Sequence, residues 1–340
     1  MRRANGTGSV VKLSGNRRKP FAVRITTGWT DKGYPIYEIL DYVETREKGL
    51  QILDEYNRNP YDVNLHNATF NELHEAWQNS PQYQKLSGGL KHNCKTGYNY
   101  CKDIGNKRYK DLRVDDFQGC INKASDKSSA TQGHIKNLFY HLDRYAYGHQ
   151  VITHMYYSLL TIDPPHPAKK IPFTDKEIQI VKDNLDYPWA DIALTMLYGG
   201  WRIGEVRELL TANVDLDNEI IQGGIKTAAG KDRIVPIHPV ILPIIKKRVE
   251  LNNKYLFGKN DKRFSQCRVY GSWHDLMDHL QIMRHTPHEC RHTFRTRLDN
   301  ANANQVCIDL LMGHASKSIG QRVYTHKTLE QLRKTILLLD

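Results

Sequence analysis

The octapeptide PHECRHTF, residues 287–294, fits two different chemistries. His288, Glu289 and His292 match H-E-x-x-H, in which two histidines one helical turn apart bind zinc. The same letters place His288, Arg291 and His292 together on a helix, where guanidinium and imidazole groups suit the binding of a phosphate. The rest of the chain has to decide between a zinc site and a phosphate clamp.

A zinc site needs a third ligand downstream of His292, and the sequence does not provide one at the usual spacing. The position six residues on is Leu298, and the next glutamate is Glu330. Pro287 also places His288 in the first turn of a helix, whereas a zinc-binding pair needs a firm helix. We therefore predict no metal and no other cofactor, and keep a zinc hydrolase as the remotest alternative.

Composition favours a polyanionic partner. The chain has 340 residues, and 49 Lys and Arg against 37 Asp and Glu give a formal charge of +12, which points first to nucleic acid. No C-x-x-C pair occurs among the six cysteines, so reduced thiols in a cytoplasm are expected. No apolar signal core opens the chain and no run long enough to span a membrane occurs. We expect a cytoplasmic, nucleoid-associated protein without a membrane partner.

The first 60 residues predict a small basic module. Residues 1–30 carry seven Lys or Arg and no acid. Two short strands flank a Ser-Gly-Asn turn, a third strand follows at 35–40, and 45–57 has helical periodicity. A basic β-ribbon fits the major groove of DNA, although a solvated charged face is the plainer alternative. The candidate DNA-binding residues are Arg17, Arg18, Lys19 and Arg24.

The remaining chain divides into a helical segment, a linker and a larger domain. Residues 64–160 show helical spacing throughout, and 161–172 (TIDPPHPAKKIP) has four prolines in twelve residues, which is typical of a linker. Thr174 and Glu177 then form a capping box that opens a domain running over 173–340. The predicted fold class is α+β and mostly α: a three-stranded N-terminal module, a helical domain, and a mainly helical C-terminal domain with a small hairpin.

Four stretches of the last domain carry candidate functional residues. In 194–209 (LTMLYGGWRIGEVREL) a helix ends at the glycines, Arg202 stands at the next helix start, and Glu205 can reach back to it. Residues 220–238 predict a hairpin that presents Lys226 and Lys231. In 310–326 a helix ends at a glycine followed by His314, and Tyr324 comes ten residues later. The tail has an apolar helical stripe that must pack on its own domain or on a neighbouring subunit: Leu329, Leu332, Ile336 and Leu339.

In this order the motifs resemble those of the tyrosine recombinase, or phage integrase, family. The resemblance covers 173–340 closely, and it rests on R-I-G-E (202–205), I-K-T (225–227), H-x-x-R-H-T-F (288–294), L-M-G-H (311–314) and Y-T-H (324–326). Residues 64–160 match the family's core-binding domain in position and type. The module at 1–60 is similar to the arm-type DNA-binding domain of integrases from phages and conjugative transposons.

The resemblance implies a reaction at a DNA phosphodiester. Tyr324 would be the nucleophile and would form a 3′-phosphotyrosyl bond, with no metal and no ATP. Arg202 and Arg291 would clamp the phosphate oxygens. His288 would accept the tyrosine proton. The further roles it implies are phosphate binding by His314, protonation of the leaving oxygen by Lys226, and support from Glu205 and His292.

The same resemblance implies the partners. These are double-stranded DNA with core and arm sites, a homotetramer on DNA, and an accessory excision factor or DNA-bending protein. The C-terminal stripe would dock on an adjacent protomer. The alternatives are a chromosome-dimer-type recombinase, a type IB topoisomerase-like enzyme, and a repressor that kept the fold without catalysis. The basic module at 1–60 favours integration or excision of a mobile element.

Overall fold

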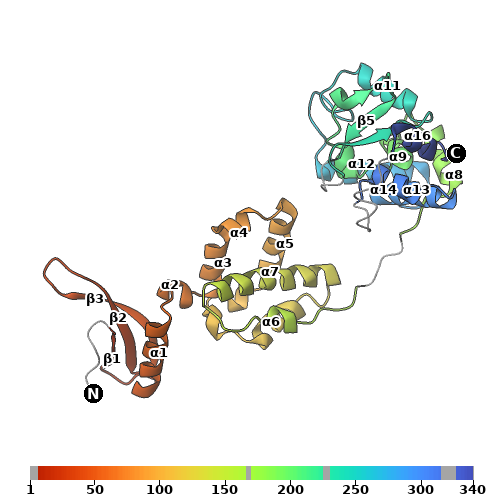
Figure 1. Ribbon diagram of the computed structural model, residues 1–340. Coiled ribbons are helices and arrows are strands. Elements are labelled where there is room, and N and C mark those ends of the chain that lie inside the picture. Colours follow the sequence, from red (N-terminus) through yellow and green to blue (C-terminus); the bar gives the residue numbers. More distant parts are fainter. Residues whose placement is uncertain (1–6, 166–169, 225–229, 315–326, 340) are drawn as a thin grey trace. The chain divides into compact units, whose positions relative to one another are not determined.

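The computed structural model describes residues 7–165, 170–224, 230–314 and 327–339. The chain forms two compact units, residues 1–167 and 168–340 (Figure 1). Among the described residues, no helix is long and apolar enough to cross a membrane. The fold is α+β and mostly helical, as the sequence predicts.

The N-terminal unit begins with an antiparallel sheet in the order β1-β2-β3. The strands are β1 (Ser9–Lys12), β2 (Phe21–Trp29) and β3 (Pro35–Val43), and α1 (Arg46–Arg58) packs against them. Val23, Leu40 and Leu53 are buried between sheet and helix, because the alternation of the strands and the stripe of the helix meet there. The three predicted strands and the predicted helix are confirmed.

The helical part of this unit is built around α7 (Ser129–Gly148), whose apolar side chains are buried against the shorter helices. Phe70, Leu73 and Trp77 are buried on α3, as their spacing predicts. Tyr109 donates to the carboxylate of Asp143 at 2.7 Å inside this core. The other helices are α2 (Val63–His66), α3 (Phe70–Gln78), α4 (Pro81–Gln84), α5 (Gly88–Tyr98) and α6 (Val114–Asn122).

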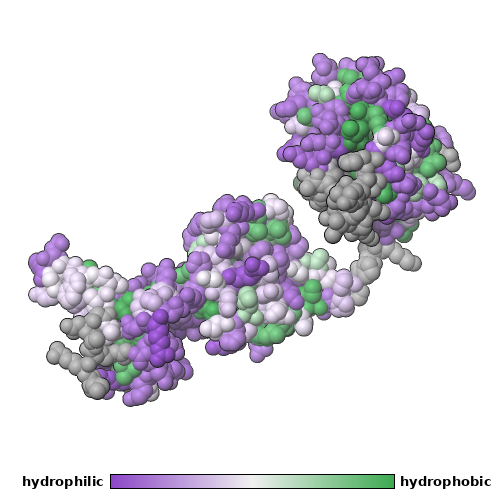
Figure 2. All heavy atoms as spheres, viewed as in Figure 1, coloured by the Kyte–Doolittle hydropathy of each residue, from purple (hydrophilic) through white to green (hydrophobic). Residues whose placement is uncertain are grey.

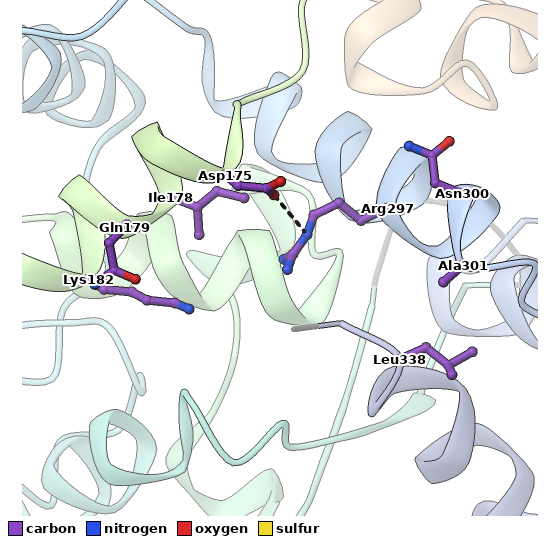
Figure 3. A pocket seen from close by; sticks show the side chains of 8 residues that line it. All are labelled: Asp175, Ile178, Gln179, Lys182, Arg297, Asn300, Ala301 and Leu338. Carbon is purple, nitrogen blue, oxygen red and sulfur yellow. Dashed lines mark ion pairs between the residues drawn. The ribbon is translucent and has the colours of Figure 1, made fainter.

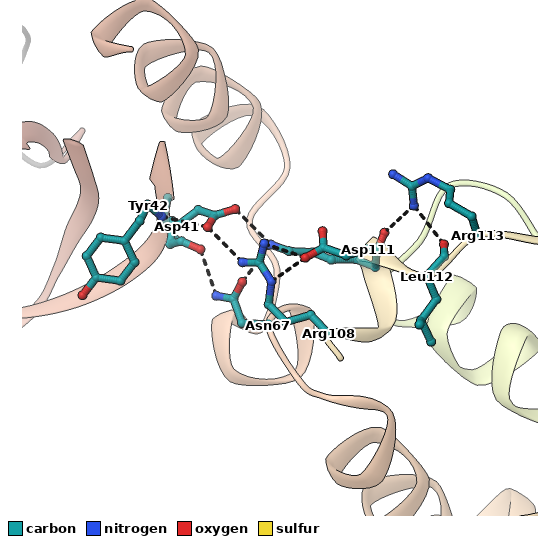
Figure 4. Close-up of polar contacts among 9 residues, drawn as sticks. Asp41, Tyr42, Asn67, Arg108, Asp111, Leu112 and Arg113 are labelled. Carbon is teal, nitrogen blue, oxygen red and sulfur yellow. Dashed lines mark hydrogen bonds and ion pairs between the residues drawn. The ribbon is translucent and has the colours of Figure 1, made fainter. Parts of the chain in front are cut away.

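A polar junction joins the sheet module to the helical part (Figure 4). Asp41 on β3 accepts from Arg108 Nη1 at 2.9 Å and from Lys110 Nζ at 3.5 Å. Lys110 also donates to Asn67 Oδ1 at 2.7 Å, and the Asn67 amide donates to the Leu40 carbonyl. Hydrogen bonds and ion pairs thus join the segments 1–60 and 64–160 inside one compact unit. The boundaries of two separate domains within this unit remain a prediction.

The start of the proline-rich segment is fastened to the helical part. Thr161 and Gln118 bond to each other through both backbone groups of Thr161. Asp163 donates its backbone N–H to Gln132 Oε1 at 2.8 Å and accepts from the Gln132 amide at 2.5 Å. At the other end, the Ile171 N–H donates to Glu289 in the C-terminal unit. The predicted linker 161–172 therefore begins and ends with residues bonded to the folded parts.

In the C-terminal unit, α9 (Ala190–Gly199) is buried almost all round, and α8 and α13 pack against it. An antiparallel sheet in the order β4-β5-β6 lies in the same unit, with the predicted hairpin formed by its last two strands. Hydrophilic side chains cover most of the visible face of the C-terminal unit (Figure 2). The remaining elements are α8 (Asp175–Asp183), α10 (Ile203–Val206), β4 (Val214–Asp215), β5 (Ile220–Gly223), β6 (Arg233–Pro236), α11 (Leu242–Glu250), α12 (Gln266–Leu280), α13 (Pro287–Asn300), α14 (Gln305–Met312) and α16 (Leu329–Ile336).

The C-terminal helix α16 packs on its own unit. Leu332, Ile336 and Leu339 are buried in the same core as α9, and α16 contacts β6 and α14. Three of the four residues of the predicted apolar stripe are therefore covered within the chain, whereas Leu329 is partly buried. Leu337 and Leu338 just beyond the helix are about half exposed.

Candidate active site

Arg202 stands where the sequence places it, between two helices. The buried helix α9 ends at Gly200, which has φ of 62° and whose carbonyl faces α13. A side chain at Gly200 is excluded, because a Cβ would lie 2.5 Å from the Phe294 ring. The chain then turns, and Arg202 becomes the N-cap residue of α10.

Glu205 is the centre of the site. Its Oε1 accepts from Arg202 Nη1 at 2.7 Å, and its Oε2 accepts from the Arg202 backbone N–H at 2.9 Å. Arg291 Nη1 lies 3.9 Å from Oε2, although Arg291 is on α13, far away in the sequence. Burial raises the pKa of Glu205, but the hydrogen bonds and charge of its arginine partners outweigh this and bring the pKa to about 2. The carboxylate therefore stays ionised and holds the cations in place.

A third arginine, Arg233 on β6, belongs to this cluster and is absent from the sequence prediction. It binds Glu205 through both nitrogens, with Nη2–Oε2 at 2.8 Å and Nη1–Oε1 at 3.1 Å. Strand alternation puts Arg233 on the same face as the buried Val235. An arginine at an inward position of a strand was the signal that could have revealed it.

Arg291 is buried and bonded at three points. Nη1 donates to the Gly200 carbonyl at 2.6 Å, and Nη2 donates to the Met312 carbonyl and to His314 Nε2, the latter at 3.0 Å. Burial, together with the nearby charges of Arg202 and Arg233, lowers the pKa of Arg291 to about 9. Burial and the neighbouring arginines make the charged form of Arg291 less favourable, so the binding of an anion at this place would stabilise it.

His314 follows α14 directly, after Gly313 ends the helix with φ of 61°. Because Arg291 can only donate, Nε2 of His314 accepts, and its proton lies on Nδ1, 3.8 Å from Asp309 Oδ1. Burial first, and then the charge of Arg291, lowers the pKa of His314. The imidazole is therefore neutral near pH 7.

His288 lies in the first turn of α13 and lines a pocket of about 770 Å³ with Arg202 and Glu205. Burial, and then the charge of Lys170, lowers its pKa, so His288 is also neutral near pH 7 and can accept a proton. Tyr270 on α12 lines the same pocket. Arg202, Glu205 and His288 thus line one opening, and Arg291 and His314 join them through the contacts of Arg291 with Glu205 and with His314.

Glu289 has a structural role that the sequence interpretation missed. Its carboxylate accepts from the Thr286 backbone N–H at 2.5 Å as the capping box of α13, and from the Ile171 N–H at 3.1 Å. His288 and His292 have ring centroids 6.4 Å apart at right angles. Within the described ranges, no group of three or more His, Cys, Asp or Glu could hold a metal ion.

A second pocket, of about 500 Å³, lies elsewhere in the unit (Figure 3). Its walls come from α8, α13 and the residues after α16, and Arg297 Nε lies 4.0 Å from Asp175 Oδ1 across it. None of the predicted site residues that the structure describes lines this pocket.

The remaining predicted residues fall into two groups. Lys226 and Tyr324 lie outside the residues that the structure describes, and Lys231, the other candidate lysine, is exposed. Arg17, Arg18 and Lys19 are exposed on the connection between β1 and β2. Arg24 lies on β2, where it donates to Ser9 Oγ at 3.0 Å and stacks over the Tyr37 ring.

The sequence profile of the phage integrase family matches residues 173–331. Residues 173–331, nearly half of the chain, belong to this family. Tyrosine recombinase XerA of Pyrococcus horikoshii is 29% identical over 183 residues, which are 51% of this chain and 63% of that protein. Tyrosine recombinase XerD of Vibrio vulnificus is 26% identical over 191 residues, with 51% and 55% covered. The chain therefore spans little more than half the length of these relatives.

Two solved structures share the fold at low sequence identity. The Tn1549 transposon integrase in complex with transposon right end DNA has 18% identity and a TM-score of 0.61, with 78% of this chain and 98% of that chain covered. The lambda integrase tetramer bound to a Holliday junction has 12% identity and a TM-score of 0.63, with 91% and 96% covered.

Proposed function

We propose that the protein is a site-specific tyrosine recombinase that cleaves and rejoins DNA to integrate or excise a mobile element. The observation that carries the proposal is the convergence of Arg202 and Arg291 on Glu205, with His288 lining the same opening. Three guanidinium groups share one carboxylate in this cluster, which leaves an excess of positive charge. A site of this kind suits a phosphodiester and its more highly charged transition state.

The two arginines would bind the non-bridging oxygens of the scissile phosphate. A planar guanidinium matches two phosphate oxygens and stays charged during the reaction. Arg202 and Arg291 are already fixed by protein contacts, so little reorganisation is needed as charge develops. This part of the catalysis needs no metal.

Tyr324 would supply the nucleophile. Its oxygen would attack phosphorus, the P–O5′ bond would break, and a 3′-phosphotyrosyl bond would form. A free tyrosine has a pKa of about 10, so a base is needed, and the neutral His288 would take the proton. Lys226 would give a proton to the leaving 5′-oxygen. A 5′-hydroxyl from another strand would reverse these steps, which conserves the bond energy without ATP.

His314 would bind the phosphate by a change of partner. Its Nε2 accepts from Arg291 at 3.0 Å in the structure. When a phosphate oxygen takes that Arg291 N–H, His314 would protonate or exchange tautomers and donate Nε2–H to the same phosphate. His292 lies beside His288 on α13 and would support its orientation.

The proposed partners are those that the resemblance to the integrase family implies. Core-site DNA would be held by the helical part and the C-terminal unit, and arm-site DNA by the basic N-terminal module. A homotetramer would assemble on two DNA sites, and an accessory excision factor or DNA-bending protein would set the direction. The formal charge of +12 and the DNA named for the two integrase structures support DNA as the partner.

The decisive experiment uses a nicked suicide substrate that carries the crossover site. A covalent protein–DNA adduct is expected with the wild type, and none with Tyr324→Phe. Tyr255→Phe is the matched control, because it removes the same hydroxyl from a tyrosine that stacks under Lys254 and does not line the pocket. An adduct that persists in Tyr324→Phe would refute the nucleophile.

A second experiment separates a mobile-element integrase from a chromosome-dimer-type recombinase. Arg17, Arg18 and Lys19 are exposed, so replacing all three by Gln should leave the fold intact. Loss of binding to arm sites at the ends of the element, with core-site cleavage retained, is expected for an integrase. Full recombination by the triple variant would favour the chromosome-dimer-type enzyme.

A further inference from the structure

We infer that Arg233 is a positioning residue that keeps the phosphate clamp open by occupying the Glu205 carboxylate. The inference rests on the proposed function, since the clamp is meant for the scissile phosphate. Arg233 is not one of the residues that the family resemblance singles out. Its side chain is 4% exposed, so it acts through Glu205 rather than on DNA.

The Arg233 guanidinium is fixed on all sides. Its two terminal nitrogens bind both oxygens of Glu205, and Nε donates to the Leu311 carbonyl at 2.8 Å. One face lies over the Trp201 ring, 4.3 Å from its centroid. These contacts connect β6, α10 and the last turn of α14, which leads to His314. A planar fork with this many contacts has one orientation available.

Arg233 limits the pairing of Arg202 with Glu205, because a carboxylate can accept only a few hydrogen bonds. A free Glu205 would pair in bidentate fashion with Arg202, and it would draw in Arg291, whose Nη1 is already 3.9 Å away. Both pairings would consume the N–H groups that a phosphate needs. With Arg233 in place, the Arg202 guanidinium donates to Glu205 only through Nη1, at 2.7 Å. The remaining donors of Arg202 stay available for the substrate.

Arg233 also preserves the excess charge. Without it, Glu205 and two arginines would leave one positive charge instead of two in the cluster. Scissile-phosphate binding should then weaken most where the phosphate is fully charged, and least where it is neutral.

The test compares Arg233→Gln with the wild type on two suicide substrates, one with a normal scissile phosphodiester and one with a neutral methylphosphonate. Adduct formation should slow by about 100-fold on the phosphodiester and by less than about tenfold on the methylphosphonate. Arg233→Lys should fall between, because it restores the charge but not the bidentate pairing. Equal slowing on both substrates, or no slowing, would overturn the inference.

The chain offers a matched control in Arg248. This arginine also binds a carboxylate, that of Asp191, and lies over an aromatic ring, that of Phe257, but has no contact with Glu205 among the contacts described. Arg248→Gln should lose a similar ion pair and slow neither substrate selectively. Selective slowing on the phosphodiester in this variant would mean that any lost ion pair produces the effect, and would contradict the role of Arg233.

Inorganic phosphate provides a readout that does not depend on DNA cleavage. Phosphate should raise the Tm of the wild type and of Arg248→Gln, and should leave the Tm of Arg233→Gln unchanged. If this pattern holds but the wild type forms no DNA adduct, the proposed function fails and the positioning role stands. If the adduct forms and Arg233→Gln matches the wild type in both assays, the positioning role fails and the proposed function stands.

Discussion

Two partly buried ionic clusters, one in each unit, differ in their charge balance. In the N-terminal unit Asp41 and Asp111 face Arg108 and Lys110, so the described acidic and basic groups cancel. In the C-terminal unit the single carboxylate of Glu205 faces Arg202, Arg233 and Arg291. A buried cluster that balances its own charge joins elements together. A cluster that leaves positive charge uncompensated is prepared for an anion from outside.

The largest expected effect is on the rate of DNA cleavage, when one arginine of the positively charged cluster is removed and compared with one arginine of the balanced cluster. Arg291→Gln should slow adduct formation on the suicide substrate by about 100- to 1000-fold, because a fixed donor to the developing phosphate charge is lost. Arg108→Gln is the counterpart in the balanced cluster and should leave the cleavage rate of bound core-site DNA unchanged. Slow cleavage in both variants would mean that the two clusters do not differ in function.

An effect of intermediate size is expected on the stability of the folded state at acid pH. The Glu205 carboxyl ionises with a pKa of about 2, against a normal value of 4.5, so ionised Glu205 stabilises the folded state above pH 4.5. That stabilisation, about 3 kcal/mol, should be lost as the pH falls from 4.5 towards 2, because the carboxyl of the unfolded state takes up its proton in this range while the folded state stays ionised.

Hydrogen exchange of the α9 and α13 amides between pH 2 and 5 would measure this loss. Glu205→Gln should remove the pH dependence in that window and should be less stable than the wild type at pH 7. An unchanged pH dependence in Glu205→Gln would assign the acid sensitivity to another carboxylate.

The smallest expected effect concerns the balanced cluster. Burial raises the pKa of Asp41, but Arg108 and Lys110 outweigh this and hold it below its usual range. Asp41→Asn should therefore weaken the junction by about 1 kcal/mol and leave the C-terminal unit unaffected. Limited proteolysis at residues 59–69 should become faster in Asp41→Asn, while the phosphate-induced rise in Tm stays as in the wild type. Unchanged proteolysis would show that the junction is held by apolar packing alone.

The local structure of the chain could be predicted because it depends on neighbours in the sequence. The glycines at 199–200 and 313 end helices, Thr174 and Glu177 cap one, and alternation defines the strands of the basic module. The tail stripe predicted a helix that packs on something, and only the folded chain shows it buried against β6 and α14.

Most of the candidate site could also be predicted, since Arg202, Glu205, His288, Arg291 and His314 stand in recognisable motifs. Arg233 and the junction at Asp41 could not, because each depends on partners distant in the sequence. Arg233 meets Glu205 across 28 residues and Asp41 meets Arg108 across 67. The sequence by itself thus determined the helices, the strands and the candidate donors of the proposed phosphate clamp. The tertiary structure alone decided which carboxylate is shared and how much positive charge is left over, because charge balance depends on distances in space.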